Sequence, residues 1–453
     1  MSDEKEKIDN NGEYALLPTE ESDEENTDKK LVTITEYRDH EHATTDFETL
    51  LHIVKATMGS GILNLPAAVR NAGVVVGPLG LLFVAIVIVH CEHLLVISSR
   101  TWCKVRGKSS MDFADVGEEC IMTRYPKKGW LGRLIINICL MLAQLGFCCV
   151  YMLFVCRNLQ QIFANNTDFA VDTRLWLLIL LPFYILISFI KNLDSLAWLS
   201  FISNVFMIVG FVCIFIYVFQ TLHNPLHLPA MAPVKNLPLF FASSIFTYES
   251  IGLILPLENE IRNIKRFPSL LNLGMAFVSV LYISMGFFGY LSCTDNCLGS
   301  ITLNLGETAY SVTVRSMMSA SVFLSYFIQA YVPFVLVESW VFTKTGSEPG
   351  MAKRCAIRAA IVFFTAVLAG TVPDLEYIIA LFGATTSTTL SITLPAILHT
   401  ISLAPNLSKF TITKNIAIVV FGIAMNILGV AVLVQKVINL YEKPKFLAGK
   451  LKV

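Results

Sequence analysis

The chain has 453 residues, of which 55% are hydrophobic and only 15% are charged, and its mean hydropathy is +0.63. A chain this apolar is not an ordinary soluble domain, and its composition is typical of a membrane protein. The formal net charge at pH 7 is zero, but this balance hides an acidic N-terminal segment.

Residues 1–47 form that segment, with 15 acidic and 5 basic side chains. A segment of this composition buries too little apolar surface to offset the entropy of ordering, so we predict a disordered tail that could bind a cytoplasmic partner. It lacks the short basic stretch and apolar core of a cleavable signal, so the first apolar helix is expected to direct insertion. Residues 14–17 (YALL) fit a tyrosine-based sorting signal for endosomes or lysosomes, although a featureless stretch of tail fits them better.

Eleven apolar stretches follow, each close to the length of about 20 residues that a membrane-spanning helix needs. They predict an all-α polytopic membrane protein with a transmembrane domain over residues 48–438 and a short C-terminal tail over 439–453. The predicted spans are residues 48–71, 75–99, 132–163, 175–193, 196–220, 238–261, 268–292, 311–341, 355–371, 375–399 and 412–438.

Positive charge alternates between the loops that join these spans, and this bias places the N-terminus in the cytoplasm. An odd number of spans then places the C-terminus outside, although the four lysines of residues 443–452 do not follow the bias. The pattern Asn165-Asn166-Thr167 lies in an outward loop of this topology and predicts glycosylation of Asn165.

Two of the spans are interrupted at corresponding positions, five helices apart. The first contains Gly59-Ser60-Gly61 within LLHIVKATMGSGILNLPAAV, and the sixth contains residues 247–252 within LFFASSIFTYESIGLILPLE. A helix can break inside a bilayer only where its freed backbone groups find partners in protein or in a wet cavity. A matching pair of breaks is the best indication in a sequence of a transporter's binding site.

The chemistry of the first break suits a small zwitterion. Glycine tolerates an unwound turn and lets a ligand approach the backbone, and the half-helix beginning near Ile62 would direct free N–H groups and its positive end at a carboxylate. The carbonyl groups that end the preceding half-helix suit an ammonium group. A packing face of small residues is the alternative, and the second break weakens it. The candidate substrate-binding residues are Thr57, Met58, Gly59, Ser60, Gly61, Phe246, Thr247, Tyr248, Glu249 and Ser250.

Two titratable residues are candidates for proton coupling. Glu249 lies at the sixth-span break, where a carboxylate costs several kcal/mol unless it is paired, hydrated or protonated; a structural carboxyl bonded to unwound backbone is the alternative. His52 precedes Gly59 by about 10 Å along a helix, and it suits a proton relay or simple packing near the cytoplasmic interface. Phe246 and Tyr248 could wall an apolar pocket or could pack between helices.

Other polar groups carry weaker signals. The run over residues 383–389 (GATTSTT), which is rich in hydroxyl groups, either bonds within or between helices or lines a wet pathway. Cys293 and Cys297 lie in the polar connection CTDNC, where a local disulfide is plausible in an oxidising compartment. No residue pattern suggests a metal site, a cofactor or an enzyme's catalytic pair, and the topology accounts for the basic residues without nucleic-acid binding. Further polar residues within spans are Asn71, Gln144, Asn204, Ser325 and Gln329.

The motifs around the two breaks resemble the proton-coupled amino acid transporters of the amino acid/auxin permease group in the APC superfamily. They are HIVKATMGSGILNLPAAVRNAGVVVGP followed by VHCEHLL, SIFTYESIGLILPLEN, and GATTSTTLSITLPAIL, and the resemblance covers about residues 47–438. It implies the leucine-transporter arrangement, a five-plus-five inverted repeat with broken helices 1 and 6 and an added helix 11. It also implies symport of glycine, alanine or proline with a proton, with His52 at the position of the family's coupling histidine.

The chain departs from the family's pattern in three places. Ser60 replaces the threonine of the usual Gly-Thr-Gly break, and Ser250 replaces a glycine, so pocket size and substrate choice are open. The loop over residues 165–174 (NNTDFAVDTR) has no cysteine, so the disulfide that some family members make from this loop to the one after the seventh span cannot form. Cys293–Cys297 is then the nearby pairing that remains.

The sequence thus predicts a proton-coupled symporter of small neutral amino acids in the plasma membrane or in endosomes and lysosomes. A sodium-coupled neutral amino acid transporter is one alternative, because carbonyl groups at broken helices also suit sodium. An amino acid sensor at the lysosomal membrane, signalling through the acidic tail with little flux, is the other.

Overall fold

The computed structural model describes residues 43–166, 171–189, 193–343, 350–372, 374–404 and 407–450. Most of the predicted acidic tail, the 14–17 motif and Thr167 of the glycosylation pattern lie outside the described residues, as does the side chain of Asn165. Within these residues the secondary structure is helical, apart from an isolated parallel bridge between Thr44 and Ile261.

The described part of the chain contains nine helices, some of them divided, that are long and apolar enough to cross a membrane. Two predicted spans fall outside this set: residues 48–71 are divided into short pieces, and α7 is a shorter apolar helix of 16 residues. The helices are α2 (Asp46–Thr57), α3 (Leu65–Ala72), α4 (Val76–Arg106), α5 (Phe113–Arg124), α6 (Gly129–Asn166), α7 (Thr173–Ser188), α8 (Leu193–Gln220), α9 (Leu237–Thr247), α10 (Ile251–Glu260), α11 (Phe267–Cys293), α12 (Ala309–Thr343), α13 (Met351–Thr371), α14 (Leu375–Phe382), α15 (Leu394–Leu403) and α16 (Lys409–Lys450).

Polar residues lengthen several helices beyond the apolar stretches that predicted them. The helix α4 runs on to Arg106 and stops where Gly107 adopts a left-handed φ of 63°, a conformation that glycine adopts without strain. The backbone of α16 stays helical to Lys450, through most of the predicted tail. The helix α5, between the second and third spans, was not predicted because it is short and mixed in polarity; Asp112 and Asp115 cap its first turn reciprocally.

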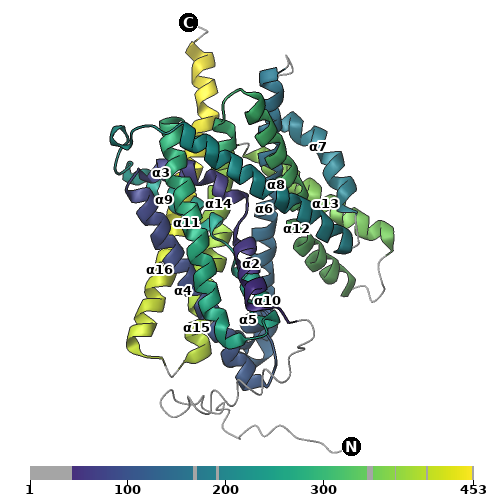
Figure 1. The fold of residues 1–453 in the computed structure, drawn as a ribbon. Helices are drawn as coiled ribbons and strands as arrows, with labels where there is room; N and C mark the ends of the chain where they lie inside the picture. The colour runs from purple at the N-terminus through teal and green to yellow at the C-terminus, as the bar shows by residue number, and fades with distance from the viewer. Residues whose placement is uncertain are drawn as a thin grey trace, which may run out of the picture.

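The chain is interrupted between α2 and α3 and again between α9 and α10. The helix α2 starts with a reciprocal cap between Thr45 and Glu48 and ends at Thr57; Gly59 is extended, and the 3₁₀ helix η1 (Ser60–Asn64) leads into α3. The second interruption leaves Tyr248, Glu249 and Ser250 outside helix. Figure 1 shows α3 and α9 in the upper half of the bundle and α2 and α10 in the lower half, and α3 packs on α9 while α2 packs on α10.

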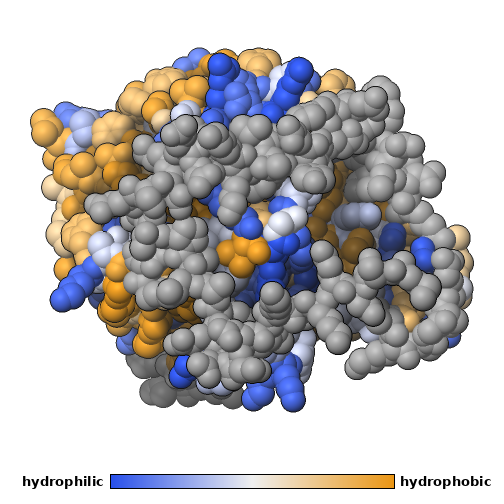
Figure 2. Space-filling view, turned by 90° about the horizontal axis from the view of Figure 1, so that it is seen from below, coloured by the Kyte–Doolittle hydropathy of each residue, from blue (hydrophilic) through white to orange (hydrophobic). Residues whose placement is uncertain are grey.

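The lower end of the bundle is polar. Seen from below, hydrophilic residues gather around the middle of this end, and hydrophobic residues lie towards its sides (Figure 2). Ion pairs join the ends of the helices there: Arg266 binds Asp46 at 2.6 Å, Arg106 binds Glu119 at 2.7 Å, and Arg100 of α4 binds Glu258 of α10 at 3.0 Å. Ion pairs at this end therefore join α4 to α5 and to α10, and join α2 to the short 3₁₀ helix η5 (Ile264–Arg266) that precedes α11.

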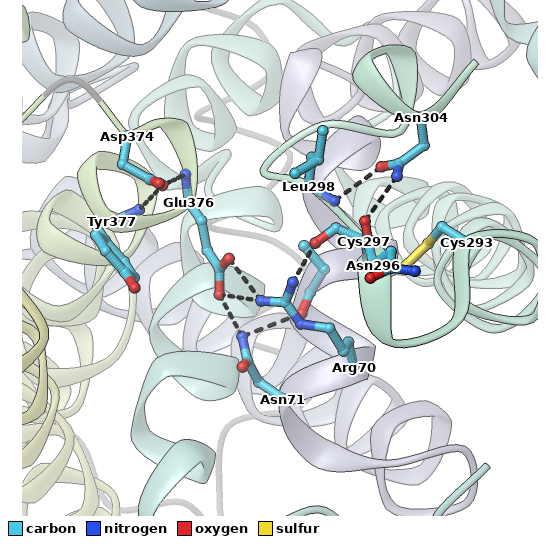
Figure 3. A network of polar contacts seen from close by, with 11 residues as sticks. Arg70, Asn71, Cys293, Asn296, Cys297, Leu298, Asn304, Asp374, Glu376 and Tyr377 are labelled. Carbon is cyan, nitrogen blue, oxygen red and sulfur yellow. Dashed lines mark hydrogen bonds and ion pairs between the residues drawn. A yellow bond between two sulfur atoms is a disulfide. The ribbon is translucent and has the colours of Figure 1, made fainter. Parts of the chain in front are cut away.

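A second polar network ties α3 to α14 (Figure 3). The Arg70 guanidinium donates to both carboxylate oxygens of Glu376, at 2.9 and 2.7 Å, and also to the carbonyl oxygen of Cys297. The amide of Asn71 donates to Glu376 at 2.7 Å. A disulfide joins Cys293 to Cys297, with Cα atoms 4.9 Å apart, so the turn after α11 presents that carbonyl to Arg70.

Candidate functional site

A cavity of about 50 Å³ lies between the two interruptions. One water needs about 10–15 Å³ on this measure, so the space takes a few waters or a small solute. It is lined by Ala56, Thr57, Gly59, Ser60, Gly61, Leu140, Gln144, Phe147, Tyr151, Phe246, Thr247, Glu249, Ser250, Gly252, Leu253, Gln329 and Leu390.

Eight of the ten predicted substrate-binding residues line this cavity, and Met58 and Tyr248 do not. The ring of Tyr248 packs edge-on against Tyr282, with ring centroids 4.9 Å apart, which turns it into the helix packing. Met58 packs partly buried against the main hydrophobic core. For these two residues, packing between helices fits better than contact with a ligand.

Tyr282 of α11 joins the two interruptions. Its hydroxyl lies 2.7 Å from the carbonyl oxygen of Thr57 and 3.3 Å from that of Thr247, the last residues of α2 and α9. A buried carbonyl group without a partner costs about 1–3 kcal/mol. One buried hydroxyl therefore serves carbonyl groups that the end of each half-helix leaves free.

The two breaks also touch directly. The Thr247 hydroxyl lies 3.2 Å from the carbonyl oxygen of Gly61, and a Cβ built on Gly61 would come within 3.0 Å of the Thr247 Cα. Glycine is required here by the close approach of backbone to backbone. At Gly59, by contrast, a Cβ would meet only the Tyr151 hydroxyl, at 3.4 Å.

Glu249 faces the cavity without a basic partner among the described residues. Its carboxylate lies near the hydroxyl of Ser387, and one of its oxygens is buried with no hydrogen bond. The neighbouring Ser250 turns towards α4 instead, where its hydroxyl donates to the carboxylate of Glu92 at 2.7 Å. The second interruption thus presents the carboxyl group of Glu249 to the cavity, while its Ser250 hydroxyl binds the carboxyl group of Glu92 on α4.

Comparison with known proteins gives the family. The family described as "Transmembrane amino acid transporter protein" matches residues 42–435. The chain belongs to this family. The transporter is 31% identical over 416 residues to the proton-coupled amino acid transporter-like protein pathetic of Drosophila melanogaster, covering 89% of this chain and 88% of that protein. It is 27% identical over 407 residues to the amino acid transporter AVT3C of Arabidopsis thaliana, covering 84% and 89%.

Among solved structures, the transporter is similar to a substrate-bound, outward-open Na⁺-coupled sialic acid symporter, with a TM-score of 0.37 and 10% identity over 85% of this chain and 97% of that one. The family membership makes this all-helical chain an integral membrane amino acid transporter and not an enzyme, as the sequence predicted.

The long helix α6 supplies a wall of the cavity that the sequence did not assign to the site. Leu140, Gln144, Phe147 and Tyr151 all line it, and the Phe147 ring packs 4.7 Å from that of Phe246. Their spacing of four, three and four residues is that of one helix face. A glutamine and a tyrosine on one face of an otherwise apolar helix were the sequence feature that could have indicated a cavity wall.

Gln329 of α12 also reaches the cavity, and its side-chain amide lies 3.5 Å from the Tyr151 hydroxyl. Gln144 and Gln329 were identified from the sequence as polar residues within spans, but the sequence does not show that they line the same cavity.

The hydroxyl-rich run between α14 and α15 mostly satisfies its own backbone. The structure winds residues 383–387 and 389–393 as π-helix, and the threonine hydroxyls donate to carbonyl groups four or five residues earlier. Ser387 and Ser391 are buried and have no hydrogen-bond partner for their hydroxyls. Bonding within the helix therefore accounts for the threonines, and Ser387 is the member of the run that lies near Glu249.

His52 lies apart from these residues. It is exposed on α2 and does not line the cavity. The structure therefore does not bring the two predicted coupling residues, His52 and Glu249, to one place.

Replacing Tyr282 by phenylalanine is expected to destabilise the transporter by about 1–3 kcal/mol, because the carbonyl groups of Thr57 and Thr247 lose a buried donor. Thermal unfolding in detergent measures the effect. Tyr290→Phe on the same helix is the matched control, since that hydroxyl makes one long contact of 3.5 Å with Asp295. Equal midpoints for the two variants would contradict the assignment.

Proposed function

We propose that this transporter is a proton-coupled symporter of small neutral amino acids, of the glycine, alanine and proline class, working by alternating access. The observation that carries the proposal is the cavity between the two helix interruptions, lined by Gly59, Ser60, Gly61 and Glu249. The name of the Drosophila relative includes proton coupling and amino acid transport, which supports the same assignment.

The proposed architecture has eleven membrane crossings. In it, α2, η1 and α3 together form a broken first crossing, and α9 and α10 form a broken sixth, as in a five-plus-five inverted repeat with one added helix. The divided segment of residues 46–72 and the 16-residue helix α7 would add two crossings to the nine longer spans of the described chain. Irregular backbone at membrane depth is tolerated where it lines a cavity, and these interruptions do so.

The substrate would lie with its carboxylate towards the amides of Gly59, Ser60 and Gly61. The α3 side of the break begins a helix, whose N-terminal end favours an anion. The ammonium group would lie towards Glu249 and the carbonyl groups near Phe246 and Thr247. The small volume and the two packed phenylalanine rings, Phe147 and Phe246, favour a small apolar side chain.

Coupling would depend on Glu249, because a carboxyl group in this setting has no counter-charge among the described residues and is costly as an anion. Binding of a proton there would favour the loaded state. His52, exposed on α2, would act as a relay at the surface of the bundle, where it can exchange protons with water.

The orientation proposed has the N-terminus in the cytoplasm, the C-terminus outside and Asn165 glycosylated. The arginines that pair at the lower end of the bundle support the cytoplasmic assignment of that end. The disulfide of Cys293 and Cys297 near Arg70 supports an oxidising compartment on the other side, which both the plasma membrane and the lysosome offer.

The test is uptake of labelled glycine, alanine, proline, glutamate and lysine into proteoliposomes containing the purified full-length transporter, with an imposed acid gradient in sodium-free buffer. Accumulation of the three small neutral amino acids driven by the acid gradient is the expected result. Uptake that requires sodium would replace proton coupling by sodium coupling, and binding without accumulation would indicate a sensor.

Glu249→Gln is expected to reduce the stimulation of uptake by the acid gradient and to alter its pH profile, while binding of labelled alanine changes less than tenfold. The amide keeps the size and hydrogen-bonding capacity of the side chain but cannot take up the proton. The pH profile of uptake measures the effect. Glu260→Gln, at the exposed end of α10, is the control. A Glu249→Gln transporter that keeps the wild-type pH profile would remove Glu249 from the coupling mechanism.

A further inference from the structure

Glu92 differs from the other buried glutamates of the described chain. Glu119, Glu258 and Glu376 each bind an arginine, at 2.7, 3.0 and 2.7 Å. Glu92, on α4, has an exposed fraction of 0% and forms no ion pair within the described residues. A carboxylate taken out of water without a partner costs several kcal/mol, so Glu92 needs an explanation that the paired glutamates do not.

The side chain of Glu92 is attached to the unwound segment before α10. One oxygen accepts the hydrogen bond of 2.7 Å from the Ser250 hydroxyl, and the other is buried without any hydrogen bond. Ser250 occupies the N-cap position of α10 and follows Glu249 directly. Glu92 and Glu249, neither of which forms an ion pair among the described residues, are thus connected through adjacent residues of one interruption.

None of the charged groups around α4 pairs with Glu92 among the described residues. The titratable groups on α4 and on the helices around it include His90, Cys91 and His93 on α4, Glu249 beside Ser250, Tyr282 on α11, His399 on α15 and Lys414 on α16, whose charge acts on His90, Cys91 and His399. Within the described chain none of these forms an ion pair or a hydrogen bond with Glu92. Arg70 of α3 and Glu258 of α10 are already paired, with Glu376 and Arg100.

A carboxyl group that is fully buried, lacks a counter-charge and is bonded to a hydroxyl is stable in its neutral, protonated form. A purely structural role, as acceptor for the Ser250 hydroxyl, would be served as well by glutamine, whose amide oxygen accepts the same hydrogen bond and carries no titratable group. The serine at position 250 gives that carboxyl a link to the segment that contributes Glu249 and Ser250 to the cavity lining.

We propose that Glu92 is a second proton-carrying site of the transport cycle, linked to the unwound segment through Ser250. The site rests on the proposed function and adds to it. The proton enters from the acidic compartment while Ser250 is bonded to Glu92. Movement of α10 away from α4 during alternating access breaks that bond, admits water and releases the proton on the other side. The cycle then moves one proton through Glu249 and one through Glu92 for each amino acid.

The experiment measures how far proteoliposomes concentrate labelled alanine at a fixed acid gradient and zero membrane potential. Each coupled proton multiplies the limiting concentration ratio by about ten per pH unit, the same 1.36 kcal/mol that one pKa unit represents. Glu92→Gln is therefore expected to lower the limiting ratio about tenfold at a gradient of one pH unit. Glu258→Gln, which alters a buried glutamate that has an arginine partner, is expected to lower thermal stability and to leave the ratio unchanged.

Ser250→Ala is the second variant, and it tests the proton site at Glu92 if Glu92→Gln does not fold. It leaves Glu92 in place but removes the hydroxyl that holds it, and it is expected to shift the pH profile of uptake. A readout independent of transport is the infrared carbonyl band of a protonated carboxyl group, which should be present in the wild-type protein and reduced in Glu92→Gln.

Failure of the inference is distinguishable from failure of the proposed function. Wild-type protein that accumulates none of glycine, alanine and proline under an acid gradient would overturn the proposed function. Wild-type accumulation with an unchanged ratio in Glu92→Gln, or with an unchanged pH profile in Ser250→Ala, would overturn the second proton site and leave proton coupling through Glu249 standing.

Discussion

Glu376→Ala is expected to destabilise the transporter by about 3 kcal/mol, the lower end of the cost of removing one partner from a buried ion pair. The Arg70 and Glu376 side chains are only 23% and 9% exposed, so water replaces little of the lost interaction. Three hydrogen bonds are lost at once, two from Nη2 of Arg70 and one from the side-chain amide of Asn71. The link between α3 and α14 in Figure 3 is therefore the polar contact whose loss we expect to matter most.

The midpoint of thermal unfolding in detergent measures this effect. The double variant Arg70→Met with Glu376→Met is expected to recover much of the lost stability, because it leaves no unpaired charge. Glu260→Ala, at the exposed end of α10, controls for the loss of a carboxylate as such. A midpoint in Glu376→Ala equal to that of this control would show that the network contributes nothing to stability.

Gly61→Val is expected to reduce amino acid uptake at least tenfold. A Cβ at this position would lie 3.0 Å from the Thr247 Cα and 3.2 Å from its Cβ, and valine adds two further methyl groups. Overpacking of this kind costs about 1–3 kcal/mol, which the structure can avoid only by separating η1 from α9. That separation changes the lining of the cavity, so binding and transport should fall together.

Labelled alanine uptake into proteoliposomes, normalised to folded protein, gives the measurement. Gly350→Val is the matched control, since a Cβ there meets no atom within 4 Å. A Gly61→Val protein that folds and transports at the wild-type rate would show that the contact between the two interruptions is not needed.

Much of the site could be predicted because local sequence determines where a helix fails. Gly59, Ser60 and Gly61 cannot sustain a regular apolar helix as well as their neighbours do, and eight predicted residues line the cavity as a result. Tyr248 does not line the cavity, because its ring packs against Tyr282, a residue 34 positions away in another helix. The α6 face and Gln329 were missed for the same reason: periodicity identifies a face but not what lies opposite it.

Sequence patterns alone were enough to predict an all-helical membrane protein, the approximate ends of its helices and its family. These depend on apolar stretches and short motifs, which are local. Only the tertiary structure decided which polar groups meet: Ser250 with Glu92, Arg70 with Glu376, and Tyr282 with both helix ends. Each of these contacts joins residues that are distant in the chain, and a buried polar group is stable only where such a partner is supplied in space.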